Sequence, residues 1–356
     1  MNKGNETLKI LREQLEQIDQ KIVPLLEQRL DLGEKIGQLK KAENRTILDL
    51  KREEALFALY ASLIQDKKKL PYVREIMKQC ITENKNIQLG RKILFTDLDG
   101  TLLNDQKEIP DGNRTAIKEA LDLNHIVTVT TGRTFESAMQ VTHQLGLDIP
   151  GCFLICYNGA VIYDFKEQKS IIDLRMSEEQ IQYLFSEAYK YDLYIQTYHG
   201  GKIWTNTLGK ELLHYSSASK MEYEIREDVV ADLRNLPNKV LLIDFNKEKL
   251  IRFQEEHKEW EQNNCSSLFS CDEYLEYCPL GASKGQGLVF LANYLGIPIE
   301  NTVAVGDEEN DISMIRAAGC GIAMKNAKDY VKEVADFVTS SNNDCGVAKV
   351  IRMFLS

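Results

Sequence analysis

The first forty residues carry a regular stripe of apolar side chains. Its members recur at alternating steps of three and four residues: Leu8, Leu11, Leu15, Ile18, Ile22 and Leu25. This spacing is typical of one face of a long amphipathic helix. Arg29 takes the next position, and Leu32, Ile36 and Leu39 continue the stripe. A guanidinium on an apolar face is costly unless it is paired, so the pattern marks Arg29 as a candidate functional residue.

Two further helical segments complete the first ninety residues, one starting near Asp49 and one following Pro71. Beyond Lys92, short β-branched runs such as KILFTDLDG, HIVTVTTGR and NTVAVGD alternate with helical stretches. That alternation predicts a parallel, Rossmann-like α/β sheet. Between about 177 and 275 the rhythm is lost, which we interpret as an inserted α+β cap.

We therefore predict a multidomain chain. An all-α domain covers 1–90, and an α/β domain covers 91–356. The core of the α/β domain comprises 91–176 and 276–356, and its cap comprises about 177–275. A length of 356 residues fits two or three domains.

Charge is distributed unevenly between these parts. Residues 1–90 contain 17 Lys and Arg against 14 Asp and Glu, whereas the remainder contains 27 against 40. The acidic larger part argues against a nucleic-acid partner. No apolar run approaches the roughly 18 residues of a membrane helix, and MNKGNETLKI lacks the apolar core of a secretory signal. Because the eight cysteines form no CxxC pair, we expect reduced thiols in a cytoplasmic protein with no membrane partner.

Carboxylates gather where strands of the α/β part are predicted to end. Asp97 and Asp99 close the first run, and Asp307 and Asp311 close the stretch NTVAVGDEEND. Because carboxyl ends of parallel strands form one edge of a sheet, we expect these side chains to meet there. Such oxygen ligands suit Mg²⁺. Taken singly, each motif is also a common turn that caps a strand or helix.

The motifs DLDGT, TTGR, SKG and GDEEND follow one another as in the haloacid dehalogenase superfamily, and residues 92–356 resemble its Cof-type, IIB-capped phosphatases. The resemblance implies that Asp97 attacks phosphorus and forms an aspartyl-phosphate, while Asp99 acts as general acid and base. It implies that Thr131 and Lys284 hold the phosphoryl oxygens. This chemistry is sensible, because a weak carboxylate nucleophile needs nearby positive charge before it approaches a phosphate.

The same resemblance implies a metal site and a substrate. Its Mg²⁺ ligands are Asp97, the backbone carbonyl of Asp99, Asp307 and Asp311. Asn158 and Asn310 are implied as substrate contacts, although a turn asparagine accounts for both equally well. Arg133 is either a substrate contact or half of a structural pair. The substrate is a small phosphorylated metabolite, with sugar phosphates, nucleotides and pyridoxal phosphate all open.

Charged side chains also follow the helical pattern of the first ninety residues. Lys40 lies eleven residues after Arg29, so on a helix both face the same way to within roughly 20° and stand about 16 Å apart. Asp49, Arg52 and Glu53 share one face of the second helix. Asp49 or Glu53 is therefore a candidate partner for a buried cation.

Residues 6–90 resemble the all-helical, AroQ-class chorismate mutases. The match runs through Arg12, Arg29, Lys40, Asp49, Arg52, Glu53 and Gln88. In that family two protomers intertwine their first helices and each pocket borrows an arginine, which implies a homodimer. Arg12 is about 25 Å along an ideal helix from Arg29 and turned roughly 100° away, so the two cannot serve one pocket of the same chain.

The mutase resemblance implies a division of roles. Arg29 and a borrowed Arg12 hold the carboxylates of chorismate, while Lys40 and Gln88 contact its ether oxygen. Glu53 and the Asp49 region meet the hydroxyl, and Arg52 adds positive field. The product is prephenate, on the route to aromatic amino acids, and no cofactor is needed because catalysis consists of holding a compact conformer and stabilising developing charge.

The sequence departs from the mutase family at two positions, and three alternative functions stay open for the two parts of the chain. Pro24 is expected to kink the first helix, and Asn84 stands where the family often has serine near the ligand. The helical part is alternatively a dimerisation or chorismate-sensing module, or a relative of isochorismate pyruvate-lyase on the same scaffold. The phosphatase site is alternatively a phosphotransferase that passes its phosphoryl group to an alcohol.

Overall fold

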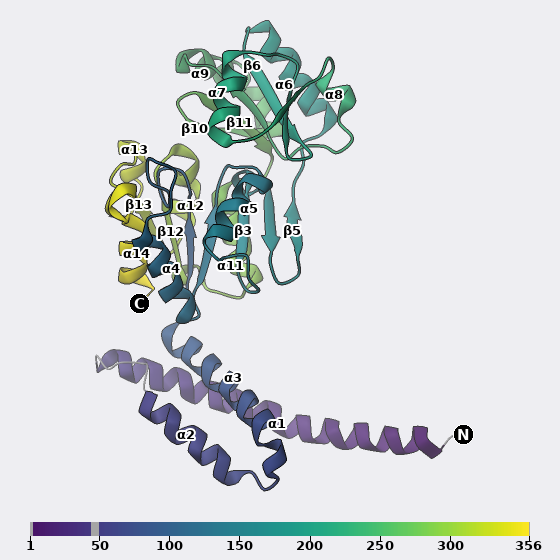
Figure 1. Cartoon of the computed structure of the whole chain (residues 1–356), viewed down its shortest axis with the longest axis vertical. Coiled ribbons are helices and arrows are strands. Elements are labelled where there is room, and N and C mark those ends of the chain that lie inside the picture. The colour runs from purple at the N-terminus through teal and green to yellow at the C-terminus, as the bar shows by residue number, and fades with distance from the viewer. Residues whose placement is uncertain (1–2, 44–49, 356) are drawn as a thin grey trace. The chain divides into compact units, whose positions relative to one another are not determined.

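The computed structural model describes residues 3–43 and 50–355, within two compact units, Met1–Arg91 and Lys92–Ser356. The first unit is helical (Figure 1). Its elements are α1 (Lys3–Ala42), α2 (Leu50–Leu63), a short 3₁₀ turn (Lys67–Lys69) and α3 (Leu70–Leu89). The predicted all-α class of this part is thereby confirmed. Gly90, with φ 68°, ends α3.

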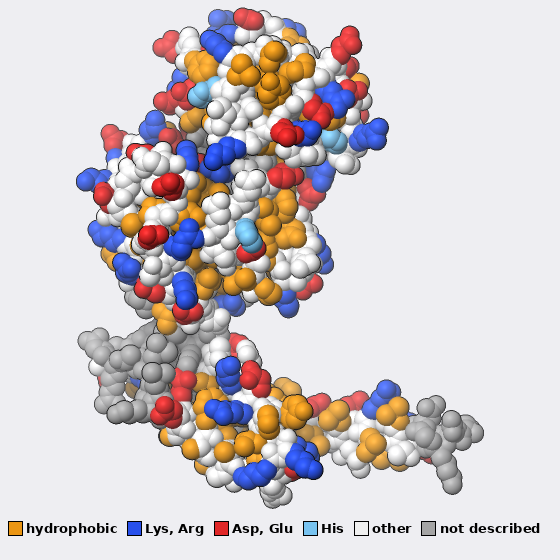
Figure 2. All heavy atoms as spheres, viewed as in Figure 1, with side chains coloured by type: hydrophobic (Ala, Val, Ile, Leu, Met, Phe, Trp, Pro, Cys, Tyr) orange, Lys and Arg blue, Asp and Glu red, His pale blue; other side chains and the backbone are white. Residues whose placement is uncertain are grey.

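The long helix α1 continues through Pro24, so this residue does not end the helix. α3 packs against α1 at Gly33, where a Cβ atom would lie only 2.8 Å from the Cγ atom of Asn84. The apolar stripe of α1 is exposed, with Ile18 at 52% and Leu25 at 62%. Figure 2 shows apolar side chains across the surface of this unit. Much of the apolar surface of α1 thus has no partner among the residues that the structure describes.

An eight-stranded sheet forms the core of the second unit, in the order β14-β13-β12-β1-β2-β3-β4-β5. Strands β14 to β3 run parallel, whereas β4 and β5 are antiparallel additions at one edge. The bounds are β1 Ile93–Thr96, β2 Ile126–Thr130, β3 Phe153–Cys156, β4 Val161–Asp164, β5 Lys169–Asp173, β12 Thr302–Gly306, β13 Cys320–Ala323 and β14 Phe337–Val338.

Helices cover both faces of this sheet. Successive residues of a strand point to opposite faces, so Leu94 of β1 packs in the cluster with α4, α5 and α14, while Ile93 and Phe95 pack in the cluster with α11. The helices are α4 Asp111–Asp122, α5 Phe135–Gln144, α11 Lys284–Tyr294, α12 Ile312–Ala317, α13 Asp329–Lys332 and α14 Gly346–Phe354. Burial on two faces explains why the strands are nearly continuous apolar runs, and the predicted α/β class is confirmed.

The cap is built on a second, six-stranded sheet in the order β10-β11-β9-β6-β7-β8, antiparallel except for the β7–β8 pair. Its strands are β6 Tyr194–His199, β7 Lys202–Thr205, β8 Tyr223–Ile225, β9 Val240–Ile243, β10 Cys265–Cys271 and β11 Tyr274–Pro279. Its helices are α6 Glu178–Lys190, α7 Lys210–Ser219, α8 Val229–Asp232, α9 Lys247–Glu256 and α10 Lys258–Asn264.

The two faces of the cap sheet have different environments. Trp204, Phe253 and Tyr277 pack with α6 and α9 in a cluster of the cap's own. Tyr198 and Tyr215, from β6 and α7, belong instead to the apolar cluster that continues into the core. The cap therefore presents one face to the edge of the core sheet. Among residues 3–43 and 50–355, no helix has both the length and the apolar character that crossing a bilayer requires.

Candidate functional site

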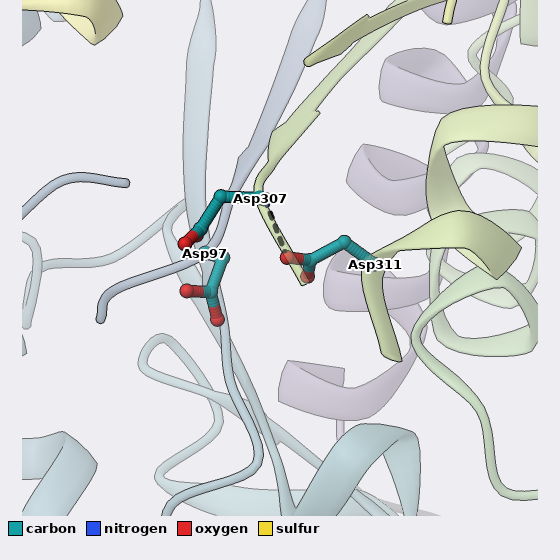
Figure 3. Close-up of side chains that lie close together, drawn as sticks. All are labelled: Asp97, Asp307 and Asp311. Carbon is teal, nitrogen blue, oxygen red and sulfur yellow. Dashed lines mark hydrogen bonds between the residues drawn. The ribbon is translucent and has the colours of Figure 1, made fainter. Parts of the chain in front are cut away.

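Three buried carboxylates meet at the C-terminal edge of the core sheet (Figure 3). Asp97 follows β1, Asp307 follows the neighbouring strand β12, and Asp311 lies one short turn later. One oxygen atom of each carboxylate lies within 4.8 Å of the others. The sheet therefore brings Asp97 together with two carboxylates that lie more than two hundred positions later in the chain.

A buried lysine joins two of these carboxylates. Lys284, the first residue of α11, donates hydrogen bonds to Oδ1 of Asp97 and Oδ1 of Asp311, both at 2.6 Å. Burial alone would lower the pKa of Lys284, but the charges of Asp311 and Asp97 raise it. The other oxygen of Asp311 accepts the backbone N–H of Asp307 at 2.8 Å. Lys284 is thus a fixed positive charge inside the cluster.

The cluster carries more negative charge than this lysine offsets. Burial, with repulsion from neighbouring carboxylates, raises the pKa of Asp97 to about 7 and the pKa of Asp307 to about 9. Gly100 has φ +79°, and a Cβ atom there would lie 2.2 Å from Oδ2 of Asp307, so only glycine fits this approach. Three convergent hard oxygen donors with uncompensated charge fit a divalent cation such as Mg²⁺.

The side chain of Asp99 has different partners. Its carboxylate accepts two hydrogen bonds from Arg133, both at 2.7 Å, and one from Lys107 at 2.8 Å. Burial would raise the pKa of Asp99, but the hydrogen bonds and charges of Arg133 and Lys107 outweigh it and hold this pKa well below its usual range. Arg133 is therefore paired with Asp99. The carboxylate of Asp99 does not belong to the cluster found among the described residues.

A cavity of about 280 Å³ lies beside these groups. Its core wall includes Asp97, Asp99 and Thr131, and its cap wall includes Tyr215 and Tyr274. Thr131 directly follows β2 and is almost fully buried, and its Oγ1 accepts the backbone N–H of Arg133 at 3.2 Å. The cavity is thus lined by side chains from both the core and the cap.

The two predicted asparagines form a buried network. Asn310 donates to Oδ1 of Asn158 at 3.1 Å, and Asn158 donates to Oε2 of Glu276 at 2.6 Å. Glu276 in turn forms an ion pair with Lys239 at 3.0 Å. Sequence reasoning missed Glu276, Lys239 and Lys107, because they belong to the irregular cap and to a loop and carry no motif spacing.

In the helical unit, the structure places Arg29 against α3. Its Nη1 atom donates to the carbonyl oxygen of Cys80 at 2.6 Å, so the partner is a backbone group and not Glu53. Asp49, the other expected partner, lies outside the described residues, as does the side chain of Gln88. Arg12 is exposed, roughly 25 Å before Arg29 along the same helix.

The remaining predicted residues lie around the helix contacts. Asn84 is half-buried on α3, and its Oδ1 atom accepts no hydrogen bond from any described residue. A cavity of about 570 Å³ between α2 and α3 is lined by Glu53, among others. Lys40 is half-buried near the end of α1, whereas Arg52 is exposed on α2. Arg29 and Asn84 thus share the α1–α3 contact, while Glu53 lines the α2–α3 cavity.

Comparison with known proteins adds a family to each unit. Residues 94–351 match the family model of haloacid dehalogenase-like hydrolases, and residues 11–89 match that of type II chorismate mutases. The chain is similar to YcsE of Bacillus subtilis, described as a 5-amino-6-(5-phospho-D-ribitylamino)uracil phosphatase, with 33% identity over 262 residues, or 73% of this chain and 94% of YcsE.

Two other similarities agree with the first. The phosphatase YwpJ of Bacillus subtilis is 33% identical over 298 residues, covering 74% of this chain and all of YwpJ (100%). The crystal structure of a haloacid dehalogenase-like hydrolase from Bacteroides thetaiotaomicron superposes with a TM-score of 0.67 at 30% identity, covering 74% of this chain and 99% of that one.

Proposed function

We propose a bifunctional enzyme, on the premise that this chain belongs to the haloacid dehalogenase-like hydrolases and carries a type II chorismate mutase domain. The domain at 91–356 hydrolyses a small phosphomonoester with Mg²⁺, its cap at about 177–275 selecting the substrate. The domain at 1–90 rearranges chorismate to prephenate. The observation that best supports the phosphatase is the buried Lys284, held 2.6 Å from both Asp97 and Asp311.

In the proposed hydrolysis, Asp97 attacks phosphorus while the bond to the leaving oxygen breaks, which gives an aspartyl-phosphate. Asp99 transfers a proton to the leaving oxygen and then removes one from the water that hydrolyses this intermediate. Because Arg133 and Lys107 hold its pKa low, this role requires both cations to withdraw from its carboxylate when the substrate binds. Lys284 and the hydroxyl of Thr131 hold phosphoryl oxygens, so that two anions can approach. Asp97, Asp307, Asp311 and the backbone carbonyl of Asp99 would hold Mg²⁺, which when bound supplies further positive charge.

Phosphate release from a panel of phosphomonoesters tests this proposal. The first compound is 5-amino-6-(5-phospho-D-ribitylamino)uracil, the substrate in the name of YcsE, followed by sugar phosphates, nucleotides and pyridoxal phosphate. Release should require Mg²⁺, and Asp97→Asn should abolish it. Phosphate release by Asp97→Asn at the wild-type rate would refute the assignment of Asp97 as nucleophile. Transfer of the phosphoryl group to an added alcohol in place of water would identify a phosphotransferase.

The mutase proposal rests on the family match over 11–89 and on the surroundings of Arg29. Arg29 is half-buried at the α1–α3 contact, near the amide oxygen of Asn84, which accepts no hydrogen bond from the described part of the chain. We assign Arg29 and Arg12 to the two carboxylates of chorismate, Lys40 and Gln88 to its ether oxygen, and Asp49, Arg52 and Glu53 to the remaining polar contacts. Because Arg12 and Arg29 are far apart on one helix, the proposal includes a homodimer that uses the exposed stripe of α1.

Mixing two inactive variants tests both parts of this proposal. Arg12→Ala and Arg29→Ala should each consume no chorismate, since each lacks one arginine in every pocket. After co-refolding, about a quarter of wild-type activity should return, because half of the randomly formed dimers carry one intact pocket out of two. Chorismate is followed by ultraviolet absorbance and prephenate is identified as the product. Absence of recovery in mixed dimers would refute the shared pocket, and an inactive wild type would indicate a sensing or dimerisation module.

A further inference from the structure

A buried ion pair from the cap contacts the core beside the phosphatase cavity. Lys239, just before β9, and Glu276, in β11, lie 3.0 Å apart, with side chains only 1% and 4% exposed. Both residues line the same cavity as Asp97. Burying two charges is expensive unless their other hydrogen-bonding sites are satisfied. The partners of each charge therefore indicate what the pair does.

Core groups supply two of those partners. Lys239 donates to the carbonyl oxygen of Gly132 at 2.7 Å, and its ammonium lies 5.4 Å from the ring centre of Tyr198. Glu276 accepts hydrogen bonds from Asn158 at 2.6 Å and from Ser270 at 2.7 Å. These partners surround both charges, so the pair acts on Gly132 and Asn158.

The two core partners, Gly132 and Asn158, lie in two segments that are hydrogen-bonded to each other. Tyr157 and Asn158 have φ values of 49° and 54°, a left-handed backbone conformation that residues other than glycine rarely adopt. Their backbone N–H groups donate to the carbonyls of Arg133 and Thr131, both at 3.0 Å. A Cβ atom on Gly132 would lie 2.9 Å from Oδ1 of Asn158. The loop 131–133 and the turn 157–158 therefore move together or not at all.

We propose that Lys239 and Glu276 are positioning residues of the phosphatase site. The ion pair holds the carbonyl of Gly132 and the amide of Asn158, and thereby holds Thr131 in place to bind a phosphoryl oxygen. This inference rests on the proposed phosphatase function. On this proposal, the geometry of the core site depends on an ion pair that belongs to the cap and lies outside every motif of the core.

The decisive variant is Lys239→Met with Glu276→Gln, which removes both charges and leaves neither unpaired. Replacing a buried ion pair by neutral groups of similar size is often harmless to stability. We therefore expect the double variant to melt close to the wild type, while kcat for phosphate release falls at least tenfold. Competitive inhibition by inorganic phosphate should weaken severalfold, because the loop that carries Thr131 is no longer held.

Two matched variants separate positioning from mere stability. Lys239→Gln with Glu276→Gln is also neutral but keeps an N–H donor that can face Gly132, so it should recover part of the lost kcat. Lys202→Met with Glu224→Gln removes another cap ion pair, at 3.1 Å, and should leave kcat unchanged. Wild-type kcat and phosphate inhibition in a folded Lys239→Met, Glu276→Gln protein would overturn the proposal, and so would equal losses in the Met and Gln versions.

Amide hydrogen exchange distinguishes failure of this inference from failure of the proposed function. If the wild type hydrolyses no phosphomonoester, exchange of peptides spanning 129–135 and 155–160 still reports whether the ion pair holds these segments. Faster exchange in the Lys239→Met, Glu276→Gln protein than in the Lys202→Met, Glu224→Gln control supports the positioning role. Equal exchange in the two proteins overturns it.

Discussion

A single lysine bridges two of the acidic side chains at the edge of the core sheet. Lys284 has no exposed surface and contacts Asp97 and Asp311 at the same distance. Its α11 backbone and its two partners hold the ammonium where it is. A fixed charge of this kind needs no rearrangement when a phosphoryl group arrives, which is why it contributes more to catalysis than a solvated one.

Replacing Lys284 by Met should therefore reduce kcat for phosphate release by about 10²–10³-fold, the range found when one preorganised group for an oxyanion is removed. The measurement is steady-state phosphate release at saturating Mg²⁺. Lys118→Met, on the exposed side of α4, is the matched control and should retain wild-type kcat. A Lys284→Met enzyme within fivefold of the wild type would contradict the role given to this residue.

The residues of the core site were more readily predicted than those of the cap. Asp97, Asp307 and Asp311 each follow a recognisable strand, so their proximity is a consequence of parallel pairing. Glu276 and Lys239 have no such signal. They meet because β9 and β11 pair within the cap sheet, and their contacts with Gly132 and Asn158 depend on how that sheet faces the core. Arg133 pairs with Asp99 in the structure, and its role toward a substrate stays a prediction.

At the scale of elements, α1 differs from the helices that cover the core sheet. The helices of the core bury their apolar faces on the sheet, whereas α1 exposes the stripe that its sequence marks as a packing face. The sequence predicts this helix and its face from periodicity alone. It does not predict that Arg29 is satisfied by the carbonyl of Cys80, because a backbone acceptor has no signature in the amino-acid pattern.

Substituting Ile18 by Glu should separate the proposed dimer. Ile18 lies mid-stripe, and a carboxylate there would have to be desolvated in a helix–helix interface. We expect the dissociation constant to rise at least tenfold, which corresponds to about 1.4 kcal/mol. Light scattering after gel filtration measures the mass. Gln20→Glu introduces the same side chain on the opposite face of α1 and should remain dimeric; equal masses for the two variants would contradict this interface.

At the scale of the whole molecule, two units of different architecture carry two different chemistries. The carboxylate cluster lies entirely within Lys92–Ser356, and the predicted mutase residues lie entirely within Met1–Arg91. The sequence predicts the boundary after Gly90, because apolar residues at helical spacing give way there to the short apolar runs that are typical of strands. The topology of the cap sheet was not, since its strands pair without a simple order along the chain.

The two activities should be separable by metal removal and by reciprocal variants. EDTA and Asp97→Asn should each abolish phosphate release and leave chorismate consumption within twofold of the untreated wild type. Arg29→Met should have the opposite effect. Both reactions are followed on the same preparations, by phosphate detection and by ultraviolet absorbance. Loss of chorismate turnover in EDTA would show that the helical unit also depends on a metal.

The joint between the units has a consequence for the gene. α3 ends at Leu89, Gly90 turns with φ 68°, and β1 begins only at Ile93, so no helix or strand crosses this stretch. A recombination event within these few codons would leave the described secondary structure on both sides complete. A single exchange at this joint would therefore add or remove one unit without cutting any described helix or strand.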